Sequence, residues 1–374
     1  MDFQVNLQDP ERIVPRLNQK INANHAPEIA FDWMKNKQET VPSETELLRN
    51  TLLPVKDDPN YEQIRKVVLP YTQLKSRFQY LDSLKLAEID SIFKVCPRSP
   101  LSPYFPSLLA YTSSILVNAV DIGGGPGAYT EYYQFRYVNS MTLGFTKRHS
   151  ENELDPAPYG WNLKVLDPHR LIRFYGNDYS GDLLGQFKDF LLYADQQFMN
   201  GAEFVIATTP TYKHQDFYAA LQLYLIIRTI KDGASAVLRL HGTWSHFMYQ
   251  VVYFATQTFE QVHLFQPLVS GSDSDEIFLV LEQARYNRKD YYLALQNLFK
   301  SIPTDLNIVD GFIANPLPND FLKQMLEIKN RFVEMQSATL LEMQKYLRDG
   351  EIGPRKKIDI VKKLLEWSLP DPYE

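Results

Sequence analysis

The stretch VNAVDIGGGPGAYTEYY, residues 117–133, decides how this chain is expected to fold. A short apolar run ends at Asp121 and leads into a glycine cluster around a single proline. Its glycines are Gly123, Gly124, Gly125 and Gly127. An apolar run of this length bounded by turn residues is typical of a buried strand, and glycine lets the backbone approach a ligand closely. The stretch therefore predicts a strand, a tight turn and a helix that contains Glu131.

Outward from this stretch, strand and helix patterns alternate. Further apolar runs predict strands at residues 140–145, 171–176, 203–209, 234–241, 260–267 and 276–282. Helical patterns lie between several of them, at 183–199, 217–230 and 244–258. This alternation predicts an α/β class with a mostly parallel central sheet and helices on both faces. In such a sheet the glycine turn lies at the carboxyl ends of the strands, where open α/β folds bind ligands.

The two ends of the chain have a different character. Residues 1–60 are polar and interrupted by prolines, so they predict an arm with short helices only. Residues 61–95 have a helical pattern, with one apolar face formed by Leu74, Phe78, Leu81 and Leu84. We therefore divide the chain into an arm (1–60), a central domain (61–300) and a C-terminal helical extension (301–374).

The extension contains an amphipathic helix whose apolar residues are spaced four, three, four, three: Phe321, Met325, Ile328, Phe332 and Met335. Its methionines, from Met325 to Met343, have two interpretations, a core face or an interface for a protein partner. A last short helix is expected at residues 357–367.

Composition narrows the class of protein. The chain has 374 residues, a formal net charge of −6 and one cysteine, Cys96. No signal-peptide pattern and no apolar run of about 18 residues is found, so we expect a soluble, metal-free protein of a reducing compartment. The expected location is the cytoplasm, with a nuclear or viral origin left open. An RNA contact would need a local basic patch such as Lys147, Arg148, His149 and Lys213, which could equally be a solvated charge run.

The glycine cluster differs from a P-loop and from a dinucleotide-binding fingerprint. It resembles the S-adenosylmethionine loop of FtsJ-like RNA ribose methyltransferases, especially their cap 2′-O-methyltransferase branch. Four further segments resemble that family in order: MTLGFTK (141–147), FYGNDYSGDLL (174–184), SAVLRLHG (235–242) and SDSDEIFLV (272–280). The resemblance implies a Rossmann-like methyltransferase fold, S-adenosylmethionine as cofactor, and RNA with a capped 5′ end as partner.

The resemblance also implies site residues. Asp121, the glycine cluster and Asp178 correspond to the cofactor site. The family's catalytic Lys-Asp-Lys-Glu tetrad matches Lys85 and Glu276, whereas Thr208 stands at the aspartate position and Arg239 at the central lysine position. Arginine stays protonated and cannot act as a base, although it can hold a phosphate or a ribose oxygen.

Several of these assignments have simpler alternatives. Asp178 and Asp182 could cap the helix that begins near residue 183. Lys75 and Arg77 compete with Lys85, and Glu276 could be a solvent-facing strand end. An aromatic group could stack bases or pack a helix on the sheet; its members are Tyr129, Tyr132, Tyr133, Phe135 and Tyr137. His214 and His241 lack a nucleophile motif beside them and are expected to be structural.

Two functions from different classes follow. The first is an S-adenosylmethionine-dependent RNA ribose 2′-O-methyltransferase that keeps Lys85 and Glu276. The second is a catalytically inactive pseudo-methyltransferase that binds the cofactor, RNA or a protein. A scaffold without any small ligand is a third possibility, in which the glycine cluster is only a structural turn.

Overall fold

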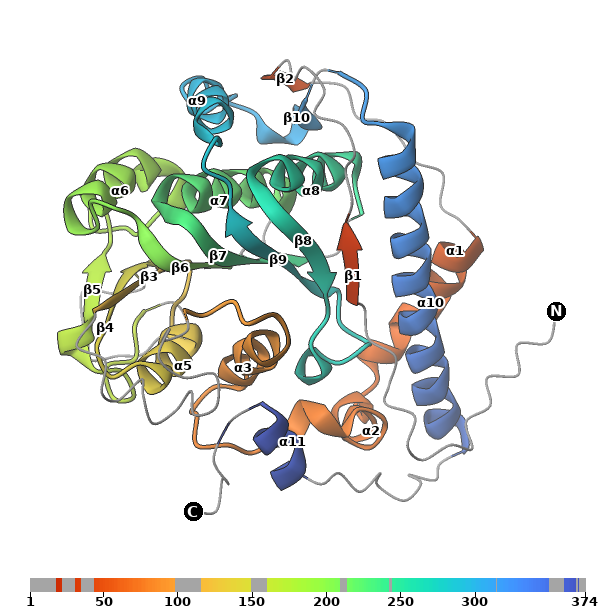
Figure 1. The fold of residues 1–374 in the computed structure, drawn as a ribbon. Coiled ribbons are helices and arrows are strands. Elements are labelled where there is room, and N and C mark those ends of the chain that lie inside the picture. The colour runs from red at the N-terminus through yellow and green to blue at the C-terminus, as the bar shows by residue number, and fades with distance from the viewer. Residues whose placement is uncertain are drawn as a thin grey trace.

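A computed structural model describes residues 18–21, 31–34, 44–97, 116–148, 160–208, 214–241, 244–313, 315–349, 360–367 and 369. Its centre is an eight-stranded sheet in the order β1-β8-β9-β7-β6-β3-β4-β5 (Figure 1). The strands are β1 (Asn18–Ile21), β3 (Val117–Ile122), β4 (Ser140–Phe145), β5 (Leu171–Phe174), β6 (Ala202–Thr208), β7 (Ile230–His241), β8 (Phe259–Phe265) and β9 (Glu276–Ala284). The neighbours from β7 to β5 are parallel, and β9 runs antiparallel between β7 and β8. The predicted α/β class with a mostly parallel sheet is confirmed.

Helices cover both faces of this sheet (Figure 1). One face packs against α6 (Leu183–Gln197), α7 (Gln215–Thr229) and α8 (His246–Thr258), and the other against α3 (Leu81–Phe93) and α5 (Ala128–Arg136). Strand residues alternate between the two cores, as a pleated strand requires. In β6, for example, Val205 and Ala207 join the first core, and Phe204 and Ile206 join the second.

The order of the strands reverses beside β3. From β3 the chain continues to β4 and β5 on one side, and then crosses over to β6 and β7 on the other. In open α/β sheets, ligands bind in the crevice that such a reversal opens at the carboxyl ends of the strands. The glycine cluster directly follows β3, so the topology places it at this crevice.

The segment 61–95 is not one helix, contrary to the expected single apolar face. It forms α2 (Tyr61–Val68), a 3-10 turn (Pro70–Gln73) and α3. Pro70 explains the break, because proline has no N–H to continue the helical hydrogen bonds. Leu74 and Phe78 lie between the helices and are nevertheless buried in the second core.

Segments from the two ends of the chain pack together. β1 pairs antiparallel with β8 at the edge of the sheet, and β2 (Phe31–Met34) pairs with β10 (Gly311–Ile313). Helix α10 (Asn319–Asp349) packs against α1 (Glu44–Leu52) and buries Met325 and Met343 completely. The core interpretation is therefore correct for these two methionines. The other α-helices among the described residues are α9 (Lys289–Leu298) and α11 (Ile360–Glu366).

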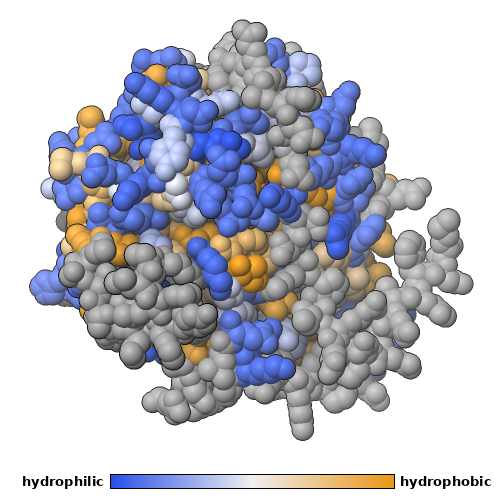
Figure 2. Space-filling view, in the orientation of Figure 1, coloured by the Kyte–Doolittle hydropathy of each residue, from blue (hydrophilic) through white to orange (hydrophobic). Residues whose placement is uncertain are grey.

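Figure 2 shows a face on which hydrophilic side chains predominate, with smaller apolar areas between them. Within the described ranges, no helix is both long enough and apolar enough to cross a bilayer.

Candidate functional site

The glycine loop, residues 123–127, is fixed to the ends of two neighbouring strands. The N–H of Gly123 donates to the carbonyl of Phe145 at 2.6 Å, and the hydroxyl of Thr208 donates to the carbonyl of Gly123 at 2.6 Å. Gly123 has a φ of +74°, and a Cβ there would lie 2.7 Å from the Thr208 carbonyl oxygen. Only glycine therefore allows the loop to lie this close to β6.

Asp121 lies beneath this loop with one oxygen unsatisfied. Its Oδ2 accepts a hydrogen bond from Thr130 at 2.7 Å, whereas its Oδ1 is buried without a hydrogen-bond partner among the described residues. A Cβ on Gly124 would lie 2.0 Å from Oδ1, so the loop backbone rests directly on the carboxyl group. Burial raises the pKa of Asp121 to about 7, against the opposing effect of the Thr130 hydrogen bond. A buried carboxyl with an unmet acceptor suits a ligand that donates hydrogen bonds or carries positive charge.

Four charged side chains meet at the end of β7, and we call them the charge cluster: Asp82, Lys85, Arg239 and Glu276. Lys85 Nζ lies 2.7 Å from Glu276 Oε2 and 2.5 Å from Asp82 Oδ1. Arg239 Nε lies 2.5 Å from Glu276 Oε1, and its Nη1 lies 3.7 Å from Asp82 Oδ2. Three positions that the resemblance assigns to the tetrad are thus in contact.

The structure also decides between the alternatives for two cluster members. Glu276 is only 3% exposed, so its interpretation as a solvent-facing strand end is wrong. Lys75 and Arg77 are both exposed, and the Arg77 guanidinium lies over the Phe135 ring at 4.5 Å. Of the three competing cations, only Lys85 contacts Glu276.

Contacts within the cluster favour the charged forms of Asp82 and Arg239. For Asp82, burial opposes ionisation, but Lys85 and Arg239 outweigh it and hold the pKa of Asp82 below its usual range. For Arg239, burial opposes the charge, but Tyr129, Glu276 and Asp82 raise its pKa above the usual value. Arg239 therefore remains a cation and cannot accept a proton. Two cations face two carboxylates, and Asp82 has the most open side chain, at 33% exposure.

Thr208 connects the loop to the cluster without joining the cluster. It is the register partner of Arg239 between β6 and β7. Its hydroxyl is directed to the Gly123 carbonyl, and its own carbonyl accepts a hydrogen bond from Gln222 at 2.6 Å. The position that resembles the tetrad aspartate thus supports the loop here.

A second link joins α3, which carries two cluster members, to the helix that follows the loop. Ser83 Oγ donates to the Ala128 carbonyl at 2.7 Å and to Glu131 Oε2 at 3.0 Å. The backbone N–H of Gln79 donates to Glu131 Oε1 at 2.9 Å. The glycine loop and the charge cluster therefore form one site at the carboxyl edge of the sheet.

The sequence interpretation missed two residues of this site. Asp82 precedes Lys85 by three positions, a spacing at which helix side chains pair, so the sequence contained a pattern that could have indicated it. Ser270, whose hydroxyl donates to Glu276 Oε2, had no such pattern. Its contact depends on the path of the turn between β8 and β9.

Asp178 and Asp182 serve different local structures. Asp182 accepts a hydrogen bond from Gly185 N at 2.7 Å and caps α6, so the capping interpretation is confirmed for this residue. Asp178 is exposed and does not cap the helix. Its Oδ1 accepts from the N–H and the hydroxyl of Ser180, at 2.9 and 2.8 Å, and these bonds lower the pKa of Asp178.

The aromatic group is mostly core. Tyr129, Tyr132, Tyr133 and Tyr137 are buried. Tyr133 stacks on Phe204 of β6 with ring centroids 5.8 Å apart. These side chains pack α5 on the sheet, so a base-stacking role for the group is wrong. Of the expected basic patch, Lys147 is exposed and Arg148 is half-buried, whereas His149 and Lys213 lie outside the described residues.

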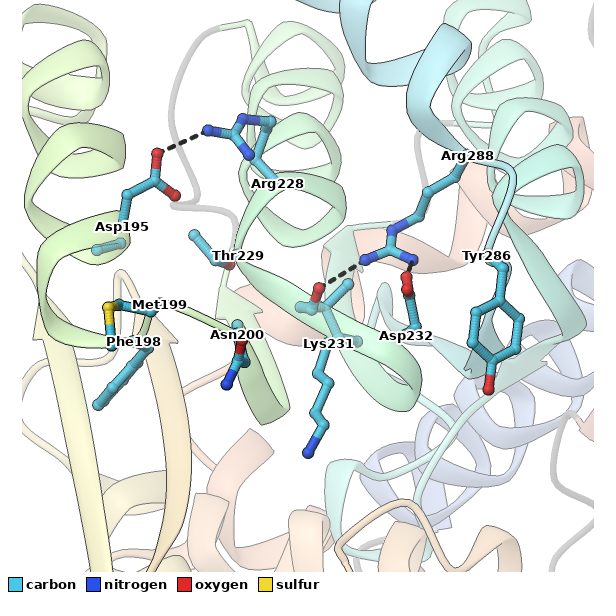
Figure 3. A pocket seen from close by; sticks show the side chains of 13 residues that line it. Asp195, Phe198, Met199, Asn200, Arg228, Thr229, Lys231, Asp232, Tyr286 and Arg288 are labelled. Atoms are coloured by element: carbon cyan, nitrogen blue, oxygen red, sulfur yellow. Dashed lines mark hydrogen bonds and ion pairs between the residues drawn. The ribbon is translucent and has the colours of Figure 1, made fainter.

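A cavity of about 560 Å³ lies at the opposite edge of the sheet, where β6 and β7 begin (Figure 3). Its wall contains three cations, each with an acidic partner. Arg228 pairs with Asp195 at 2.8 Å, Lys231 with Glu203 at 3.3 Å, and Arg288 with Asp232. These pairs join neighbouring elements and indicate a structural role. Across the described ranges, no group of three or more His, Cys, Asp or Glu side chains could hold a metal ion.

Comparisons with known proteins match the part of the chain that contains this site. A family model described as FtsJ-like methyltransferase matches residues 82–284, which include the glycine loop and the whole charge cluster. Cap-specific mRNA (nucleoside-2'-O-)-methyltransferase 1 of Mus musculus is 21% identical over 91% of this chain and 44% of the mouse protein. Its counterpart in Dictyostelium discoideum is 24% identical over 84% of this chain and 44% of that protein.

The chain thus spans less than half the length of these relatives. A solved structure of human methyltransferase-like protein 13 in complex with SAH has a TM-score of 0.37 and 11% identity, over 60% of this chain and 95% of that chain.

Proposed function

Because the chain belongs to the FtsJ-like methyltransferase family, we propose that it binds S-adenosylmethionine and RNA as a ribose 2′-O-methyltransferase-type protein that acts near a capped 5′ end. The convergence of Lys85, Arg239 and Glu276 beside the glycine loop carries this proposal. The similarity to cap-specific mRNA methyltransferases supports the choice of substrate.

The residues around the glycine loop fit this cofactor. S-adenosylmethionine carries a sulfonium and an ammonium group, and supplies the methyl group when bound. The unsatisfied Oδ1 of Asp121 beneath the loop suits such a cation. Gly123 approaches Thr208, and Gly124 approaches Asp121, so closely that a side chain at either position would displace the loop.

The charge cluster fits the ribose side of the reaction. A ribose hydroxyl has to be oriented and has to lose its proton to a nearby group. Lys85 and Arg239 offer cationic hydrogen-bond donors for a ribose or phosphate oxygen. Asp82 is the most open carboxylate and is the group that we assign as proton acceptor, in place of the missing lysine base. Because the pKa of Asp82 is lowered, we expect slow methyl transfer.

A second candidate is a pseudo-methyltransferase that binds without turnover. It is favoured by Arg239, which is already paired with Glu276, and by Thr208, whose hydroxyl is committed to the loop. Both groups stand where the family's tetrad has its central pair.

Transfer of a labelled methyl group from S-adenosylmethionine to a short capped RNA tests the two candidates. The first predicts label on a ribose 2′ oxygen, located by nuclease digestion. Cofactor binding without any label would select the second candidate. A chain that binds neither the cofactor nor RNA would reject both.

A further inference from the structure

Tyr179 is an exposed aromatic residue in an unusual backbone conformation. Tyr179 is 65% exposed, and its φ of +57° lies in the left-handed region that tyrosine rarely adopts. It lies in the turn between β5 and α6. Strained positions of this kind persist where surrounding contacts impose them, and they concentrate at ligand sites.

Hydrogen bonds hold this turn on both sides of Tyr179. Its own N–H donates to the Gly176 carbonyl at 3.2 Å, and Gly181 N donates to the Tyr175 carbonyl at 2.6 Å. On the far side, Arg148 N donates to the Ser180 carbonyl at 3.0 Å. The ring of Tyr179 is therefore presented to solvent by a fixed backbone.

Arg148 supports the ring from one side. Its guanidinium carbon lies 5.9 Å from the centroid of Tyr179 and 5.7 Å from that of Tyr175, within the range of a cation–π contact. The sequence had suggested Arg148 as part of a phosphate-binding patch, but the structure directs it to these rings. Since Tyr179 is mostly exposed, much of its ring stays open for a further planar group.

The turn that carries Tyr179 lies next to the glycine loop. Gly125 N donates to Thr146 Oγ1 at 3.1 Å, and a Cβ on Gly181 would lie 2.0 Å from the Thr146 carbonyl oxygen. Thr146 thus touches both the loop and the turn that carries Tyr179. All these contacts lie at the carboxyl ends of β3, β4 and β5.

We propose that Tyr179, supported by Arg148, is a stacking platform for a nucleobase at this edge of the sheet. Aromatic and guanidinium faces are the groups on which proteins stack single bases. The base could belong to the adenosine of the cofactor or to RNA, and both sources share this chemistry. The inference rests on the proposed function, which supplies both ligands.

The test measures two affinities in the full chain by calorimetry, with S-adenosylhomocysteine and with a capped five-nucleotide single-stranded RNA as probes. Tyr179→Ala is expected to weaken one of them by at least about fivefold, the loss typical of one stacked base. Tyr179→Phe, which keeps the ring, should remain within about twofold of wild type. The probe that responds identifies the source of the base.

Two controls separate the ring from the backbone and from general effects. Tyr179→Gly, which relaxes the left-handed conformation, should weaken the same probe as Tyr179→Ala does. Tyr286→Ala removes another exposed tyrosine, 82% exposed and at the opposite edge of the sheet, and should leave both affinities unchanged. If Tyr179→Ala binds both probes with wild-type affinity, the stacking role of Tyr179 is overturned, but the proposed function is not. A wild-type chain that binds neither probe would overturn the proposed function and the platform with it.

Discussion

Lys85 Nζ lies 2.7 Å from Glu276 Oε2, although Lys85 comes from the helix α3 and Glu276 from the strand β9, 191 positions later in the chain. Arg239 occupies the other oxygen of the same carboxylate. One buried carboxylate therefore holds two cations at the edge of the glycine loop. The stability of the site and its chemistry both depend on this arrangement.

Replacing Glu276 by glutamine should destabilise the protein strongly. The variant leaves two cations close together without their buried carboxylate, and breaking a buried ion pair costs about 3–5 kcal/mol. Chemical denaturation measures the loss in unfolding free energy. Glu260→Gln is the matched control, because Glu260 pairs with Arg285 at the surface and should cost about 1 kcal/mol or less. Equally small losses of unfolding free energy in both variants would show that the buried contacts of Glu276 do not stabilise the fold.

Asp82→Asn should impair methyl transfer without affecting the cofactor. It removes the most open carboxylate of the charge cluster, so we expect the turnover number to fall by roughly 100-fold, as for loss of a general base. The affinity for S-adenosylmethionine should stay within about twofold, because Asp82 does not contact the glycine loop. Asp82→Glu should recover part of the rate. An unchanged turnover number in Asp82→Asn would show that Asp82 takes no part in the chemical step.

Restoring the family's central pair should raise the rate. The double variant Thr208→Asp with Arg239→Lys supplies a carboxylate and a titratable amine, and we expect roughly a 100-fold gain in methyl transfer. Thr208→Asp alone should not help, because Arg239 stays protonated and no titratable amine is supplied. If the double variant gains nothing, either the two residues are not in the tetrad positions or the chain does not bind RNA.

Asp121 should make stability depend on pH. Burial raises its pKa in the folded protein to about 7, from an ordinary value near 4. Between these values the folded state binds the extra proton, so this contribution is present at low pH and is lost as the pH rises through 7. Relative to Asp121→Asn, the wild type should lose about 2–3 kcal/mol of unfolding free energy from pH 5 to pH 8. A constant difference between the two proteins over this range would contradict the assignment.

The central strands were predictable because of their burial. Strands covered on both faces are continuous apolar runs, so β3, β4, β6 and β9 could be placed from the sequence within a few residues. The helix boundaries were close as well: α6 ends at Gln197, two residues before the expected end. The short strand β1, with the sequence NQKI, was missed. It is polar, and its pairing with β8 depends on tertiary contacts.

The site was predictable only in part. A glycine loop after a buried strand is a local pattern, and the family resemblance pointed to Lys85 and Glu276. Asp82 was not predicted because it was not part of that resemblance. Ser270 was not predicted because its contact joins a turn to a strand end. The aromatic group was ambiguous because tyrosine suits both a core and a base-stacking surface.

The most direct test of the whole account is calorimetric titration of S-adenosylmethionine into the wild type and Gly125→Arg. We expect one cofactor molecule to bind per wild-type chain and none to bind to the variant, while circular dichroism shows both chains folded. Heat of binding that is absent in the wild type, or that is the same in both chains, would contradict a methyl-donor site at the glycine loop.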